Sequence, residues 1–271
     1  MIPARGRGIF SCAKLILGLA FLAPWAMAGE PGVSPPSVGY ASFVSWNYSQ
    51  LPQLRAWKET ERIIATTLAE GYPALRELQH VENGSPEQLK DFFRKLPDAP
   101  NQLTLVYLGG HQSPAGEWYF TDGTDHNWGD LMEGLPKLRN PQRIVLLDCC
   151  YAQSASLWPD WSQKIAPACL FASPGNRPTP DLLVFWRRPV DWAALFPGAS
   201  LWLRQHQFHD SDERITFFGL VWLEAWMKGT APPRNWSEWR HLAQTMTQIA
   251  QHASTQIRSN AISEISSVFP P

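Results

Sequence analysis

Short apolar runs alternate with segments of helical periodicity through the first two thirds of the chain. The runs 103–108 and 144–147 are continuous and rich in branched residues, which is typical of strands buried on both faces of a sheet. The segment 56–68 instead has apolar residues close to helical spacing. This alternation predicts a mostly parallel sheet covered by helices on both faces. Strands are expected at 40–46, 75–81, 103–108, 144–147 and 168–172, and helices at 56–68, 86–96 and 131–138.

Two local signals fix element ends in this region. Ser85-Pro86-Glu87-Gln88 reads as a helix start, with serine as the N-cap, proline at the first helical position and glutamine closing a capping box. Residues 117–121 followed by Asp122-Gly123 predict one arm and the turn of a hairpin.

The last third of the chain is helical. Residues 217–227 and 236–257 have helical patterns, and Pro-rich connections and a polar loop, 205–214, precede them. No internal repeat and no separating linker interrupts the chain, so we expect one domain over 39–258 and a C-terminal tail over 259–271.

The first residues have the layout of a targeting signal. Basic residues precede an apolar run, 15–23, and Ala26-Met27-Ala28 has the small-x-small form of a cleavage site. We expect a signal peptide over 1–28, a mature chain starting at Gly29 with a flexible leader over 29–38, and a secreted or periplasmic protein. An uncleaved anchor is the alternative. No second apolar stretch is long enough to span a bilayer, so no stable membrane span is expected after cleavage.

Composition narrows the function classes. The net charge of −1 comes without a basic run or stripe, so no nucleic-acid partner is expected. Of the four cysteines, Cys149, Cys150 and Cys169 remain after signal cleavage. An odd number is a poor disulfide framework, and no C-x-x-C pattern indicates zinc. We therefore expect no metal and no cofactor.

Candidate catalytic residues lie at the ends of two predicted strands. Gly109-Gly110-His111 follows one, and Asp148-Cys149-Cys150 ends the other. Ligands and catalytic groups lie outside the carboxyl ends of strands in a parallel sheet. If the two strands are neighbours, an imidazole and a thiol face one another, which is the pairing that activates a cysteine nucleophile.

A strand ending in Gly-His, followed by one ending in Asp-x-Cys, resembles the caspase-like cysteine peptidases, in particular the bacterial and metacaspase branch. The resemblance covers roughly residues 40–231. It implies a three-layer caspase-like fold and an endopeptidase acting on peptide or protein substrates. It also implies that Cys150 is the nucleophile, His111 the base or leaving-group acid, and the backbone N–H groups of Gln112 and Cys150 the oxyanion hole. Cys149 should point to the other side of its strand, as a core residue.

The resemblance also implies a substrate preference. An aspartate two residues before the nucleophile helps to form an acidic pocket in this family, and Asp148 matches that position. Glu59 falls near a second acidic position of the metacaspase pocket. Cleavage after Arg or Lys is therefore expected. The alternative for Asp148 is a carboxylate capping nearby backbone N–H groups, and the alternative for Glu59 is a solvated helix face.

Two departures from the family pattern leave other interpretations open. Gln112 stands where the family has glycine, and Tyr151-Ala152-Gln153 stands where metacaspases have His-Ser-Gly. A catalytically weak or inactive caspase-like domain that binds peptides or a partner protein is therefore the main alternative. A non-peptidase α/β domain with chance motifs is a further one. His206, His209, Asp210 and Asp212 share one loop, but their spacing matches no known metal-binding loop.

Overall fold

The computed structural model describes residues 37–51, 55–99, 102–139, 142–152, 155, 158–171, 191–208, 215–257 and 266–269. The predicted signal peptide and nearly all of the predicted leader lie outside these residues. The described strands are β1 (Ser37–Val44), β2 (Arg76–Glu82), β3 (Gln102–Gly110), β4 (Glu117–Tyr119), β5 (Asp125–Asn127), β6 (Arg143–Cys149), β7 (Ala168–Phe171) and β8 (Ser266–Val268). The described helices are α1 (Ala56–Gly71), α2 (Pro86–Lys95), α3 (Trp128–Met132), α5 (Trp161–Lys164), α7 (Trp192–Leu195), α8 (Pro197–Gln205), α9 (Phe217–Lys228) and α10 (Trp236–Ile257).

The central sheet is mostly parallel, as the sequence predicts. Its described strands lie in the order β2-β1-β3-β6-β7-β8. The first five run parallel to one another, and β8 runs antiparallel to β7 at the edge. Residues 266–268, which the sequence analysis assigns to a tail, thus form an edge strand of the sheet. The short antiparallel pair β4–β5 is separate and matches the predicted hairpin.

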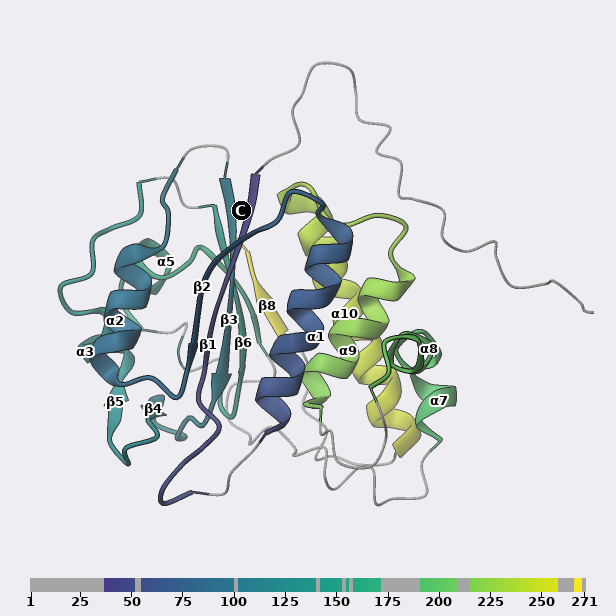
Figure 1. Cartoon of the computed structure of the whole chain (residues 1–271), viewed down its shortest axis with the longest axis horizontal. Coiled ribbons are helices and arrows are strands. Elements are labelled where there is room, and N and C mark those ends of the chain that lie inside the picture. Colours follow the sequence, from purple (N-terminus) through teal and green to yellow (C-terminus); the bar gives the residue numbers. More distant parts are fainter. Residues whose placement is uncertain are drawn as a thin grey trace, which may run out of the picture. The chain divides into compact units, whose positions relative to one another are not determined.

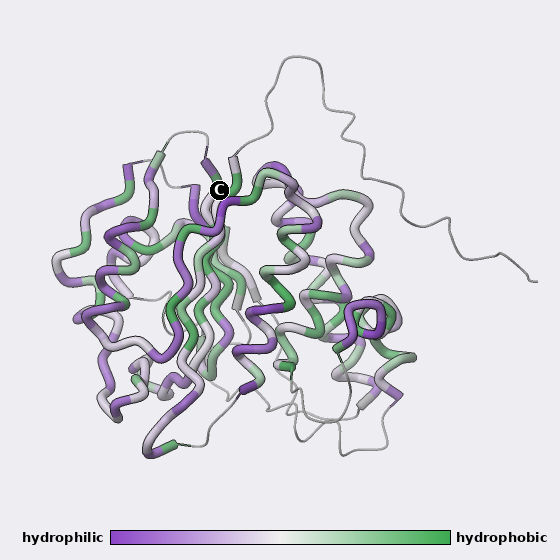
Figure 2. Tube along the Cα trace, in the orientation of Figure 1, coloured by the Kyte–Doolittle hydropathy of each residue, from purple (hydrophilic) through white to green (hydrophobic). Residues whose placement is uncertain are grey.

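Helices cover both faces of this sheet and make three layers (Figure 1). One face packs against α1, α9 and α10, and the other against α2, α3 and α5. Alternate residues of β6 supply the two cores: Ile144 and Leu146 lie in the first, and Val145 and Leu147 in the second. Hydrophobic residues accordingly follow the central strands in Figure 2. A strand buried on both faces has no polar side, which explains the continuous apolar runs of the sequence.

The structure confirms one predicted helix start and corrects the bounds of another helix. The capping box at Ser85 is confirmed, since its side chain accepts from the Gln88 N–H while the Gln88 side chain accepts from the Ser85 N–H. The helix expected at 131–138 is wrong in position, because α3 spans Trp128–Met132. Asn127 caps its start by accepting from the Asp130 N–H. The positive φ of 72° at Gly134 turns the chain away at its end.

The segment before α9 contains two helices where the Pro-rich sequence predicts connections. These are α7 and α8, and they lie on the outer side of the layer that holds α9 (Figure 1). Trp202 of α8 is buried against this layer, and its indole N–H donates to Glu70 of α1 over 3.0 Å. Within the described residues, no helix is both long and apolar enough to cross a membrane.

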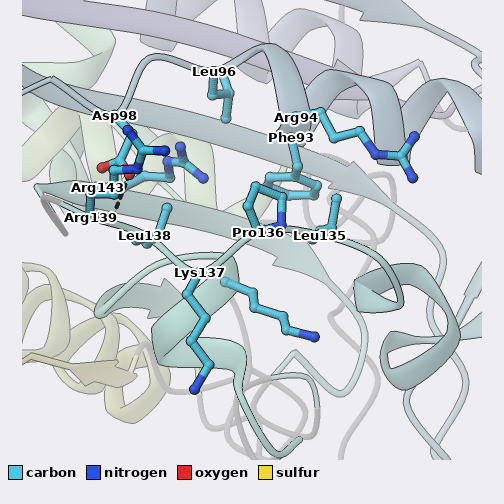
Figure 3. Close-up of a pocket in the computed structure, with 11 residues that line it drawn as sticks. Phe93, Arg94, Leu96, Asp98, Leu135, Pro136, Lys137, Leu138, Arg139 and Arg143 are labelled. Atoms are coloured by element: carbon cyan, nitrogen blue, oxygen red, sulfur yellow. Dashed lines mark hydrogen bonds between the residues drawn. The ribbon is translucent and has the colours of Figure 1, made fainter.

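The amino end of β6 lies beside a cavity of about 220 Å³ (Figure 3). It is bounded by the end of α2, the segment 135–139 and the start of β6. The carboxyl ends of the strands, where the sequence predicts chemistry, are at the opposite end of the sheet.

Candidate active site

The sheet register brings the two predicted catalytic residues to the same edge. β3 and β6 are parallel neighbours, and their last aligned pairs are Gly109 with Asp148 and Gly110 with Cys149. His111 and Cys150 are the next residue on each strand. Successive side chains of a strand alternate between its two faces. Counted by this alternation, His111 and Cys150 both continue the positions that face the α1, α9 and α10 layer.

The two neighbouring cysteines differ in burial. Cys149 is fully buried in the core that contains α2 and α3, and burial raises the pKa of its thiol well above the ordinary value. Cys150 is half-buried. Cys149 is therefore a packing residue, and Cys150 is the more accessible thiol. This is the division expected from strand alternation.

Two aromatic rings hold the His111 imidazole. The ring centroids of His111 and Tyr48 lie 4.7 Å apart, and those of His111 and Trp57 lie 4.8 Å apart in an edge-to-face arrangement. The backbone N–H of His111 also donates to the Tyr48 hydroxyl over 2.9 Å, and that hydroxyl donates to the Ser45 carbonyl. The loop after β1 and the first turn of α1 therefore fix where the imidazole lies.

Tyr48 is also close to the thiol side of the site. Burial raises the pKa of its hydroxyl, and Cys149 and Cys150 are near enough to raise that pKa further. The glycine before His111 is needed for this packing. A Cβ at Gly110 would lie 2.7 Å from the Trp118 ring and 3.0 Å from the Tyr48 hydroxyl. The close approach of these rings explains a glycine at this point of the strand.

Gln112 is turned so that its backbone N–H points away from β4. The hydrogen bonds on either side, from the Tyr119 N–H to the His111 carbonyl and from the Ser113 N–H to the Glu117 carbonyl, belong to the bridge between Gln112 and Trp118. In this antiparallel pattern the residue between the two bonds directs its own N–H outward. The direction is compatible with the oxyanion role that the resemblance implies.

The Gln112 side chain joins two loops at the site. It is buried, and its Nε2 donates to the Tyr151 carbonyl over 2.8 Å. Its Oε1 accepts from the Trp128 indole over 2.9 Å. Tyr151 has a φ of 52°, in the left-handed region that non-glycine residues seldom adopt. The Gln112 amide thus holds the turn after Cys150, at the position where the resemblance leads us to expect glycine. Gln153 lies outside the described residues.

Asp148 lies beneath the surface and not at the mouth of a cleft. Its side chain is fully buried and accepts from the Tyr107 hydroxyl over 2.9 Å and from the Thr216 hydroxyl over 2.6 Å. Thr216 is the N-cap of α9 and also bonds to Thr60 of α1. Burial raises the pKa of Asp148 from 3.8 to about 7, although these hydrogen bonds oppose the rise. In the described structure the carboxyl therefore ties β6 to β3 and to the start of α9.

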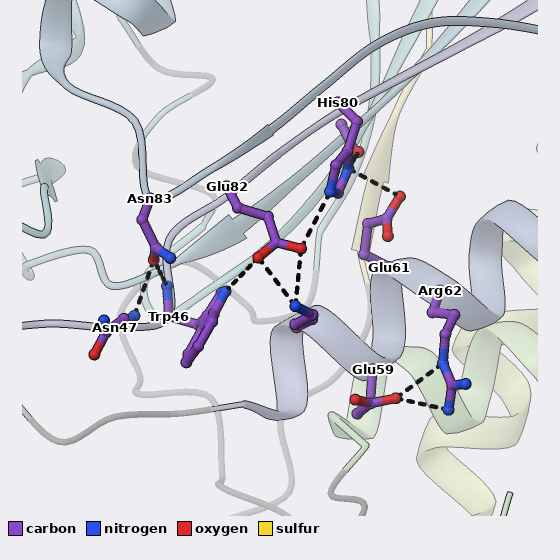
Figure 4. A network of polar contacts seen from close by, with 10 residues as sticks. Trp46, Asn47, Glu59, Glu61, Arg62, His80, Glu82 and Asn83 are labelled. Atoms are coloured by element: carbon purple, nitrogen blue, oxygen red, sulfur yellow. Dashed lines mark hydrogen bonds and ion pairs between the residues drawn. The ribbon is translucent and has the colours of Figure 1, made fainter.

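Glu59 lies in the first turn of α1 and pairs with Arg62 of the same helix over 2.9 Å. The Glu59 side chain thus lies on the face of its own helix, with 19% of it exposed. Other residues of α1 fasten the helix to β2, since Lys58 pairs with Glu82 and the His80 imidazole lies between Glu61 and Glu82 (Figure 4). These contacts hold α1 where Trp57 meets His111.

Of the four residues in the loop considered as a metal site, His206 lies within the described residues. His206 stacks on Trp202 with ring centroids 3.8 Å apart and bonds to Glu70 over 2.6 Å. His209, Asp210 and Asp212 lie outside the described residues. In the part of the chain that is described, no three His, Cys, Asp or Glu side chains are grouped to hold a metal ion.

Three residues around this site were not predicted: Tyr48, Trp57 and Thr216. Each is distant in sequence from the group it touches; Tyr48 and His111, for example, are 63 positions apart. The available signals were weak. Tyr48 follows the first strand, Trp57 opens an amphipathic helix, and Thr216 precedes an apolar run as an N-cap would.

Comparison with known proteins supports the fold. No family model matches the chain, and no curated protein matches it. Among solved structures, caspase-1 from Spodoptera frugiperda has a TM-score of 0.53 and 12% identity, covering 86% of this chain and 85% of that one. The Drosophila initiator caspase Dronc has a TM-score of 0.51 and 7% identity, covering 87% and 81%. The chain has a caspase-like α/β fold, and at this identity the likeness concerns the fold alone.

Proposed function

We propose that this chain is a cysteine endopeptidase in which Cys150 is the nucleophile and His111 transfers the proton. The observation that carries the proposal is the register of β3 and β6, in which the residues after the aligned pair Gly110 and Cys149 are His111 and Cys150. The mostly parallel sheet supports the same assignment, since ligands and catalytic groups of such sheets lie outside the carboxyl ends of the strands. The bacterial and metacaspase branch remains the subfamily that we propose from the Asp148-Cys149-Cys150 motif.

The chemistry follows from a thiol and an imidazole at one strand edge. The Cys150 thiolate attacks the scissile carbonyl carbon, and the oxygen of the resulting tetrahedral species takes the negative charge. The C–N bond then breaks as the His111 imidazolium gives its proton to the departing amine. A water molecule, deprotonated by the same imidazole, cleaves the thioester and releases the carboxylic acid.

The backbone N–H groups of Gln112 and Cys150 are the proposed donors to the oxyanion. The outward direction of the Gln112 N–H supports this role. Loss of one oxyanion donor costs about 10²–10³ in kcat in well-studied hydrolases. The turn after Cys150 positions one of these two donors, the Cys150 N–H. The Gln112 side chain holds this turn by donating to the Tyr151 carbonyl.

Covalent labelling tests the dyad directly. The purified protein is treated with a thiol-directed peptidyl probe, and the labelled residue is identified by mass spectrometry. We expect labelling at Cys150 that is abolished in Cys150→Ala and strongly slowed in His111→Ala. Cys149→Ala is the matched control, because its buried thiol should make no difference to labelling. Equal labelling of the Cys150→Ala variant would show that the nucleophile is assigned wrongly.

Substrate preference is the finer part of the proposal. We propose cleavage after Arg or Lys. The buried carboxyl of Asp148 would attract the basic side chain electrostatically from beneath the pocket, and Glu59 would be a second acidic group. The Asp148 pKa of about 7 gives this proposal a distinctive signature. About a tenth of such a carboxyl is ionised at pH 6 and about nine tenths at pH 8. The kcat/KM for cleavage after a basic side chain should therefore rise with pH, relative to that for an uncharged side chain.

Two peptides that differ only at the residue before the cut, arginine against its uncharged analogue citrulline, measure this gain. The ratio of their kcat/KM values cancels the titration of the dyad itself. We expect this ratio to rise by up to about tenfold between pH 6 and pH 8, and Asp148→Asn to remove the rise. A ratio that does not change with pH, or faster cleavage after Asp, would exclude Asp148 from the specificity pocket.

A second candidate function is a catalytically weak or inactive caspase-like domain that binds peptides or a partner protein. The observation that favours it is the amide of Gln112, which occupies the place of a glycine and bonds to both Tyr151 and Trp128. A Gln112→Gly variant separates the two functions. If the wild type is folded yet unlabelled by the probe, and the variant is labelled, the amide holds the site in an inactive form.

Export is proposed from the amino-terminal pattern of the sequence. The mature protein should begin near Gly29 and be found outside the cytoplasm, in the periplasm or the medium. N-terminal sequencing of the protein recovered from those fractions measures this. Recovery of an intact Met1 on membrane-bound protein would contradict cleavage and favour the anchor.

A further inference from the structure

The cavity at the amino end of β6 is distinct from the proposed active site. Arg143 begins β6 at this cavity, whereas Cys150 follows the other end of the strand. A strand rises about 3.3 Å per residue, so about 23 Å separate the two positions. The cavity has a volume of about 220 Å³, which suits a small molecule or part of one and excludes a folded partner.

Cationic side chains dominate the polar lining of this cavity. Lys137 and Arg139 are exposed at its rim (Figure 3). Asp98 is the acidic residue of the lining, and it accepts a hydrogen bond from the backbone N–H of Arg139. The lining therefore has a formal charge of about +4, although the chain as a whole has −1. The five cations are Arg94, Lys137, Arg139, Arg143 and Lys164.

Arg94 and Lys164 each lie close to an acidic side chain, and both contacts are weak. Arg94 pairs with Asp91 over 2.9 Å on the exposed face of α2. Lys164 lies 3.8 Å from Asp160 and donates to the Met132 carbonyl over 3.3 Å. Exposed pairs within one helix contribute little and are screened by salt. They leave the positive potential of the cavity largely intact.

Arg143 differs from the other cations of the lining because it is buried. Its side chain is 3% exposed, and one terminal nitrogen donates to the Ile165 carbonyl over 3.1 Å. Its Nε lies buried with no hydrogen-bond partner among the described residues. Burial lowers its pKa to about 10, so the guanidinium stays charged at neutral pH. The nearby Asp98 carboxylate opposes this lowering of the pKa. The Arg143 guanidinium lines the cavity, so its positive charge would attract an anion bound there.

The remaining lining is apolar and helps to select the ligand. Phe93, Leu96, Leu135 and Pro136 form the walls beside the charged groups. Apolar walls lower the local dielectric constant and strengthen the attraction between the cations and an anion. Phosphate oxygens match the planar fork of donors on a guanidinium better than a spherical ion does.

We propose that this cavity binds a small phosphate-bearing anion, with Arg143 as the buried donor and Arg139 and Lys137 as the groups at the rim. Asp98 opposes the ligand and limits its affinity. Binding at this cavity involves neither His111 nor Cys150, so its test does not depend on whether the proposed dyad is catalytic. Its ligand is recognised by charge and by phosphate geometry.

Calorimetry with inorganic pyrophosphate on the full-length protein tests the proposal, with sodium chloride added to equal ionic strength as the reference. We expect saturable binding with Kd below about 1 mM, and a thermal midpoint that rises with pyrophosphate and not with chloride. The Lys137→Gln, Arg139→Gln double variant should weaken binding about tenfold or more. Both residues are exposed, so this variant should fold normally.

Two further variants make the test specific. Arg76→Gln, Arg204→Gln removes the same charge from exposed positions outside the cavity and should leave the Kd unchanged. Asp98→Asn keeps the acceptor for the Arg139 N–H and removes the opposing charge, so it should tighten binding several-fold. Absence of saturable binding, or an equal loss in the distant double variant, would overturn the site. Tighter competition by a short DNA duplex through the same residues would overturn the ligand class.

Discussion

Replacing Asp148 with asparagine should change how the free energy of unfolding depends on pH. The carboxyl is fully buried, and burial raises its pKa from 3.8 to about 7. In the unfolded chain it returns to its ordinary value. The folded state therefore holds this proton between about pH 4 and pH 7, while the unfolded state releases it. The stability that the protonated group contributes is fully present below about pH 4 and is lost as the pH rises through about 7.

The size of this loss follows from the two pKa values. One pKa unit corresponds to about 1.36 kcal/mol, so the difference between 3.8 and about 7 amounts to about 4 kcal/mol. Whole domains are stable by only about 5–15 kcal/mol. The asparagine variant cannot ionise, and its carbonyl oxygen can still accept from Tyr107 and Thr216. Its stability relative to the wild type should therefore improve by about 4 kcal/mol between pH 4 and pH 8.

Urea unfolding of both proteins at pH 4.5, 6, 7 and 8 measures this relative stability. The new amide N–H group needs an acceptor and costs about 1–3 kcal/mol, but that cost is the same at every pH. The slope with pH is therefore the readout. Asp91→Asn, at an exposed residue paired with Arg94, is the control and should change stability by no more than about 0.5 kcal/mol. A constant difference between Asp148→Asn and the wild type, or one that favours the wild type at high pH, would refute the reasoning.

Three other substitutions test how the site and its supports are packed. Tyr48→Phe removes the acceptor of the His111 N–H and should lower the unfolding free energy by about 1–3 kcal/mol and slow any peptide cleavage; unchanged values in urea titration and kinetics would contradict the proposed support of the imidazole. Gly110→Ala places a Cβ 2.7 Å from the Trp118 ring and should cost about 1–3 kcal/mol, with a changed near-UV circular dichroism signal; an unaltered spectrum and midpoint would argue against that close contact. Ser85→Ala removes the N-cap of α2 and should cost about 1 kcal/mol, which the urea midpoint measures, whereas Ser85→Thr should retain most of the stability.

The sequence by itself determined the features that arise from short-range physics. The apolar runs of β3 and β6 predict strands buried on both faces, because a parallel sheet leaves no face for polar residues. The capping box at Ser85 depends on groups three residues apart, and the separation of Cys149 from Cys150 depends on strand alternation. The order of these elements was enough to predict a mostly parallel sheet between two helical layers.

Tertiary structure decided what depends on residues far apart in the chain. Tyr48 and Trp57 meet His111 because α1 is fastened to β2 and the loop after β1 folds over the end of β3, and no local pattern encodes those contacts. The buried carboxyl of Asp148 accepts a hydrogen bond from Thr216, which lies 68 positions away at the start of α9. Whether a strand-end carboxylate faces solvent or lies beneath a helix depends on which element packs over it. That packing is set by the whole sheet and its layers, and for this reason the strand's own sequence did not reveal it.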